Sequence, residues 1–163
     1  MKDAEGRAGQ AWLWAPVIFS ASGVLVSGYL SVKRVTGGSL ACTRWADCDV
    51  VNNSVYAKIY GVPVAFIGLA GYLILMGLAM AALQAEGAAQ RRLLALGFLL
   101  ALGGFGFSVY LTYLELYVIE AICMWCVISA ILITLLAIVG GINLWRTTHE
   151  PLDTAPTPSP LRP

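Results

Sequence analysis

The most regular feature of the chain is a set of four long hydrophobic stretches without Asp, Glu, Lys or Arg. They cover residues 8–32, 59–85, 93–114 and 121–145. Each exceeds the roughly 20 apolar residues that a helix needs to cross a bilayer core of about 30 Å. We therefore predict an all-α fold, an integral membrane four-helix bundle. Its helices are expected near residues 11–31, 62–83, 93–114 and 121–145.

The polar segments around these stretches differ in length. Residues 33–60 form a long hydrophilic loop that is too polar for lipid and too short to be a domain. The lead, residues 1–10, is expected to be disordered. The first hydrophobic stretch is longer than the apolar core of a cleaved signal peptide, so we treat it as a true span. Residues 149–163 hold five of the seven prolines and are expected to be a disordered tail after a membrane domain of residues 1–148.

Composition supports this class. The chain is 59% hydrophobic and 12% charged, whereas a soluble domain is about 25% charged. The net charge is +1, and no basic patch interleaved with aromatic residues predicts a nucleic-acid partner. The lipid bilayer is therefore the expected environment.

Four cysteines form two pairs in the sequence. Cys42 and Cys48 lie in the long loop, and Cys123 and Cys126 form a C-x-x-C motif at the start of the last hydrophobic stretch. Cysteines three apart on a helix share one face, and a helix N-terminus stabilises a thiolate. Counting spans places both pairs at one membrane face and both termini at the other.

The distribution of charge and the cysteine chemistry predict which face this is. Six basic residues lie on the side of the termini and four on the side of the cysteines, a small difference that favours cytoplasmic termini. Stable disulfides belong in an oxidising compartment. We therefore expect a multi-pass protein of the plasma (inner) membrane, with the cysteines on the extracytoplasmic face and both termini cytoplasmic.

Three kinds of chemistry could use two cysteine pairs. Two structural disulfides would explain Cys42 and Cys48, but closing the short loop between Cys123 and Cys126 adds little stability. A four-thiolate metal site would make the chain a non-catalytic metal-binding membrane protein, although the spacing of Cys42 and Cys48 is wider than usual. A thiol relay, in which a loop pair exchanges disulfides with a fixed membrane pair, explains the pairing, the shared face and the polar loop together.

The order of the pairs adds a family resemblance. In membrane relays of the DsbB type the C-x-x-C motif comes first, whereas here the wider pair comes first. The chain therefore resembles the vitamin K epoxide reductase family, and its bacterial members in particular, over about residues 12–145. The residues that carry the resemblance are Cys42-x5-Cys48, Ser54, Ile59-Tyr60-Gly61, Ser108-Val109-Tyr110-Leu111 and Cys123-Met124-Trp125-Cys126.

The resemblance implies a role for each cysteine. Cys126 would face a quinone ring and donate electrons to it, and Cys123 would resolve the resulting Cys123–Cys126 disulfide. Cys48 would be the loop thiol that attacks Cys123, and Cys42 would receive electrons from the partner. The resemblance also implies that Ser54 aids quinone reduction through a polar contact.

Two further residues are assigned to the ring pocket on the same resemblance. Tyr60 and Leu111 would line it, although plain helix packing would explain them equally well. Ala57 and Ala130 stand where animal members carry Asn and Tyr, so reduction of vitamin K epoxide is not implied.

The function implied is that of a quinone-dependent thiol–disulfide oxidoreductase. It would reoxidise a separate thioredoxin-fold (DsbA-like) protein and pass the electrons to menaquinone or ubiquinone, which supports disulfide bond formation. The partner is expected to be separate because the chain ends in a proline-rich tail rather than a thioredoxin-like domain.

Overall fold

The computed structural model describes residues 2–43 and 46–149, with side chains from residue 12 onward. Within this part of the chain, four helices are long and apolar enough to cross a membrane. They are α1 (Lys2–Thr36), α3 (Val64–Gln84), α4 (Gly87–Leu114) and α5 (Met124–His149). The predicted all-α membrane bundle is confirmed. Of the tail expected to be disordered, residues 150–163 lie outside the described residues.

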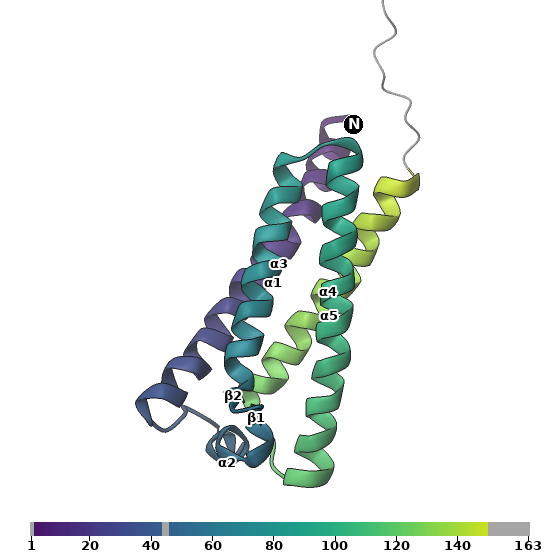
Figure 1. Ribbon diagram of the computed structural model, residues 1–163. Helices are drawn as coiled ribbons and strands as arrows, with labels where there is room; N and C mark the ends of the chain where they lie inside the picture. Colours follow the sequence, from purple (N-terminus) through teal and green to yellow (C-terminus); the bar gives the residue numbers. More distant parts are fainter. Residues whose placement is uncertain (1, 44–45, 150–163) are drawn as a thin grey trace, which may run out of the picture.

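The four helices form a ring. Both α1 and α4 contact α3 and α5, so α1 and α4 occupy diagonal positions. Figure 1 shows the start of α1 and the end of α5 at one end of the bundle and the short elements α2 (Cys48–Asn53), β1 (Lys58–Ile59) and β2 (Val62–Pro63) at the other. Both cysteine-bearing segments therefore lie at the end away from the start of α1 and the end of α5.

Three helices extend beyond their expected ranges. α1 begins at Lys2, within the lead that was expected to be disordered, α4 begins at Gly87, and α5 continues to His149. The limits of a charge-free stretch mark the hydrocarbon core. The helical hydrogen bonds can continue past that core where the flanking residues, such as Ala, Gln and Arg, are good helix formers.

Before the second long helix, the structure has a short β-hairpin where the start of the helix was expected. β1 and β2 form an antiparallel hairpin in which Ile59 pairs with Val62. Its turn residues Tyr60 and Gly61 have φ values of 50° and 84°. Positive φ at both central residues is typical of the tight turns that join hairpin strands. The helix expected to begin near residue 62 therefore begins at Val64, after the hairpin.

Two buried clusters hold the bundle together. One lies along the helices and contains Tyr72, Leu75, Ala101, Ile133 and Leu136. There α1 approaches α3 closely at Gly23, where a Cβ atom would collide with the Tyr72 ring. The other lies at the cysteine end and contains Leu30, Leu40, Cys48, Val51, Ala121 and Cys123.

Candidate active site

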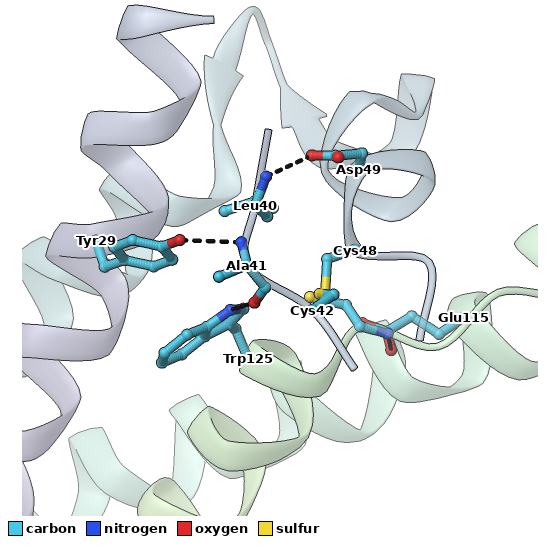
Figure 2. The surroundings of a disulfide bond; sticks show 9 residues. Tyr29, Leu40, Ala41, Cys42, Cys48, Asp49, Glu115 and Trp125 are labelled. Carbon is cyan, nitrogen blue, oxygen red and sulfur yellow. Dashed lines mark hydrogen bonds between the residues drawn. A yellow bond between two sulfur atoms is a disulfide. The ribbon is translucent and has the colours of Figure 1, made fainter. Parts of the chain in front are cut away.

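The loop between α1 and α3 carries a disulfide. It joins Cys42 to Cys48, the first residue of α2, and their Cα atoms are 6.2 Å apart. Figure 2 shows two side chains that hold the backbone just before Cys42: the Asp49 carboxylate accepts the Leu40 N–H at 2.9 Å, and the Tyr29 hydroxyl accepts the Ala41 N–H at 3.1 Å. The disulfide is thus tied to both α1 and α2.

The disulfide-bearing loop is also bound to the C-x-x-C segment. The Trp125 Nε1–H donates to the Ala41 carbonyl oxygen at 2.9 Å, as Figure 2 shows. The Trp125 ring lies against Tyr29 with a centroid distance of 4.8 Å. On the other side of Cys123, the Asp47 N–H donates to the Ile122 carbonyl oxygen at 3.0 Å. The loop is therefore anchored on both sides of Cys123.

Cys48 and Cys123 are buried in the same cluster. Their exposed fractions are 1% and 0%. Cys123 and Cys126 are both free thiols. A hydrogen bond from the Cys126 thiol lowers the pKa of Cys123 below that of an ordinary thiol, although burial and the Glu115 carboxylate oppose this. A thiol with a lowered pKa forms the attacking thiolate more readily.

Cys126 has different surroundings. It lies in the first turn of α5 and lines a cavity of about 350 Å³ between the four long helices and the loop. Most of the cavity wall is apolar and comes from residues such as Ile67, Leu100, Phe107, Leu111 and Ile133. The two C-x-x-C thiols therefore face different partners, Cys123 the loop and Cys126 the cavity.

Glu115 is a site residue that sequence reasoning missed. It begins a π-helical turn, η2 (Glu115–Ile119), and its side chain is only 6% exposed. Its carboxylate accepts the Cys123 N–H at 3.2 Å, and Glu115 lines the same cavity as Cys126. By sequence alone Glu115 is only the residue that follows the third hydrophobic stretch. The available signal was an acidic residue directly after a long apolar stretch, where a charge is costly and often functional.

A comparison with known protein families gives a match that includes both cysteine pairs. Residues 14–140 match the model described as the vitamin K epoxide reductase family. The chain belongs to this family. As a member of the vitamin K epoxide reductase family with four membrane-spanning helices, it is a membrane thiol oxidoreductase, and the family is generally quinone-linked.

The expected pocket residues fall into two groups. Ser54 and Leu111 line the cavity beside Cys126, as does Ala57, which presents only a methyl group. Tyr60 does not line it, because its side chain is fully exposed at the tip of the β1–β2 hairpin. The assignment of Tyr60 to the pocket is corrected, and the reason is local: the tight turn directs this side chain away from the bundle.

The cavity suits a quinone ring. Its volume falls in the range of small-molecule sites, about 300–1,000 Å³, and such sites combine apolar walls with a few polar groups. Here those groups include Ser54, Ser108, Thr112 and Ser129.

Within residues 2–43 and 46–149, no three or more His, Cys, Asp or Glu side chains are grouped as metal ligands.

Proposed function

We propose that the chain is a quinone-dependent thiol–disulfide oxidoreductase that supports disulfide bond formation. It takes electrons from a separate thioredoxin-fold (DsbA-like) protein and passes them through its two cysteine pairs to menaquinone or ubiquinone. The observation that carries this proposal is the division of the C-x-x-C pair: Cys123 is packed with Cys48, whereas Cys126 lines the apolar cavity.

The thiol steps follow from the accessibility of the sulfurs. Cys42 is partly exposed and Cys48 is buried, so a partner thiolate attacks Cys42 and Cys48 leaves as a thiolate. The partner's second thiol then breaks the mixed disulfide. Cys48 next attacks Cys123 of a Cys123–Cys126 disulfide, and Cys126 leaves as the thiolate. Attack of Cys42 on Cys48 restores the loop disulfide and releases Cys123, so every step exchanges one S–S bond for another.

The last step takes place at the cavity. A quinone bound there would supply the two-electron acceptor that restores the Cys123–Cys126 disulfide. The chain contributes Cys126 at the cavity wall and an apolar surface that includes Leu111. The docked loop helps to separate this chemistry from water, since Val51 of the loop is buried and lines the same cavity.

The test is quinone reduction by the purified protein with a reduced thioredoxin-fold protein, followed by quinone absorbance. Cys126→Ala should abolish quinone reduction while the Cys42–Cys48 disulfide still exchanges with the partner. Val127→Ala, next in the chain and 42% exposed, is the matched control and should retain activity. Quinone turnover in Cys126→Ala equal to that of the wild type would refute the relay. Near-stoichiometric zinc or copper in the reduced protein would instead support a metal-binding protein.

We also propose that the cysteine end is extracytoplasmic and the termini are cytoplasmic. The excess of basic residues on the terminal side and the need of disulfides for an oxidising compartment support this orientation. A membrane-impermeant maleimide added to intact, reduced cells should label Cys42. Labelling of Cys42 only after lysis would reverse the orientation.

A further inference from the structure

Glu115 is the one acidic or basic side chain among the buried polar residues that the structure describes; the others are Ser20, Ser27, Ser31 and Asn143. A buried carboxylate is costly unless it has hydrogen-bond partners or a counter-charge. No Lys, Arg or His lies among the described residues that line the cavity beside it. The burial of Glu115 therefore calls for a reason other than charge pairing.

The contacts of Glu115 converge on the C-x-x-C motif. Its backbone carbonyl oxygen accepts the N–H groups of Glu120 and Ala121, the latter at 3.1 Å. Its carboxylate accepts the Cys123 N–H, and Glu115 lines the cavity together with Cys126. The π-helical turn that Glu115 begins is an arrangement found often at functional sites. The carboxylate therefore lies against the C-x-x-C backbone and at the cavity that Cys126 faces.

The proposed reaction requires proton transfer at this place. When a dithiol reduces a quinone, two S–H bonds break, one S–S bond forms and two O–H bonds form on the quinone. The proton of Cys126 must therefore travel from sulfur to a quinone oxygen inside an apolar cavity. The other polar groups of the lining are hydroxyls and one amide, which do not take up a proton near neutral pH. Glu115 is the carboxylate that lines it.

We propose that Glu115 is the general base and acid of quinone reduction: its carboxylate accepts the S–H proton of Cys126 and delivers it to an oxygen of the quinone. This inference rests on the proposed function. The two electrons come from the Cys123 and Cys126 thiols and the second proton comes from Cys123, so the dithiol is oxidised to a disulfide and the quinone is reduced to the quinol. Glu115 regains its starting state in each turnover.

A purely structural role has a different consequence. If Glu115 only accepts the Cys123 N–H, then Gln should replace it, because the Gln amide oxygen accepts the same bond at nearly the same size. Gln cannot carry the proton. Asp can carry it, although its carboxylate would lie further from Cys126. The order of Glu, Asp and Gln in the proton-transfer step therefore separates the two roles.

The experiment compares Glu115→Gln and Glu115→Asp with the wild type, and Glu120→Gln serves as the control. Glu120 is an exposed acid of the same turn. The first readout needs no quinone: the rate at which a membrane-permeant maleimide alkylates Cys126, with the site confirmed by peptide mapping. The thiolate is the species that reacts, and the negative charge of Glu115 disfavours it, so the rate should rise at least about tenfold in Glu115→Gln and stay near that of the wild type in Glu115→Asp, which keeps the charge. Glu120→Gln should match the wild type.

The second readout is the rate of quinone reduction by prereduced protein in a single turnover. A general acid–base group contributes about 10²- to 10⁴-fold, so Glu115→Gln should be slower by at least about 100-fold, with Asp in between. Exchange of the loop disulfide with partner thiols should be unchanged, which also shows that the variant is folded. Should Glu115→Gln fail to form the loop disulfide, the comparison passes to Glu115→Asp, which must reduce quinone more slowly than the wild type.

Two results would overturn the inference. One is a Glu115→Gln variant that equals the wild type in both readouts; the other is a folded Asp variant that reduces quinone no faster than Gln. Failure of the proposed function looks different. The wild type would then reduce no quinone, while the alkylation rates would still report whether the Glu115 charge acts on Cys126.

Discussion

Trp125 couples the redox loop to the second cysteine pair, and replacing it with Phe separates its two contacts. Phe keeps an aromatic ring against Tyr29 but removes the Nε1–H donor to the Ala41 carbonyl oxygen. One such hydrogen bond contributes about 1 kcal/mol, which is about a fivefold change in the ratio of docked to undocked loop. Leu removes both contacts, and the aromatic pair adds about 1 kcal/mol, so the change becomes about 30-fold.

The assay measures how well the loop shields Cys123, whose exposed fraction is 0% when the loop is docked. The rate of Cys123 alkylation by iodoacetamide, mapped by mass spectrometry, should therefore rise about fivefold in Trp125→Phe and about 30-fold in Trp125→Leu. The control is Trp145→Phe, because Trp145 is 63% exposed near the other end of α5. Equal alkylation rates in the wild type and in Trp125→Leu would refute the reasoning.

The other predictions concern the relay and the cavity. Cys126→Ser should accumulate a Cys48–Cys123 disulfide, seen by non-reducing peptide mapping: the Cys123 thiolate attacks Cys48 of the loop disulfide and Cys42 leaves, no Cys126 is present to attack Cys123 and release Cys48, and alkylation of the freed Cys42 prevents the reverse step; a bridge from Cys123 to the other loop cysteine would reverse the assignment of the loop pair. Leu111→Trp should raise the KM for quinone by at least about tenfold, because a larger side chain at the wall occupies part of the cavity. Tyr60→Ala should leave that KM unchanged because Tyr60 is fully exposed, and a comparable rise in KM would return Tyr60 to the site.

The helix ends differ from the limits of the charge-free stretches. The charge-free stretches located the four spans but placed the start of α4 too late, since Arg91 and Arg92 are helical. Hydrophobicity reports which residues suit lipid, whereas the hydrogen bonds of a helix continue into water. The start of α3 was misjudged for another reason. A two-residue turn at Tyr60 and Gly61 depends on backbone dihedrals that hydrophobicity does not encode.

The candidate site likewise has residues that the sequence predicts and one that it does not. The sequence was enough to predict two cysteine pairs at one membrane face, and in the structure Ser54, Leu111 and Cys126 line one cavity. Glu115 stood out little, because an acid just after an apolar stretch is also the ordinary start of a polar turn. Only the return of the chain through η2 brings its carboxylate to the Cys123 backbone and to the cavity that Cys126 lines.

The sequence by itself determined the properties that depend on order along the chain. The lengths of the apolar stretches specify four spans, an even number of spans puts both termini at one end, and the positions of the cysteines put both pairs at the other. The tertiary structure decided which groups meet. Cys123 meets the loop, Cys126 meets the cavity, and Glu115 meets the Cys123 backbone and the cavity. The physical reason is that burial and hydrogen bonding of these groups come from helices and loops far apart in the sequence, whose packing no local pattern records.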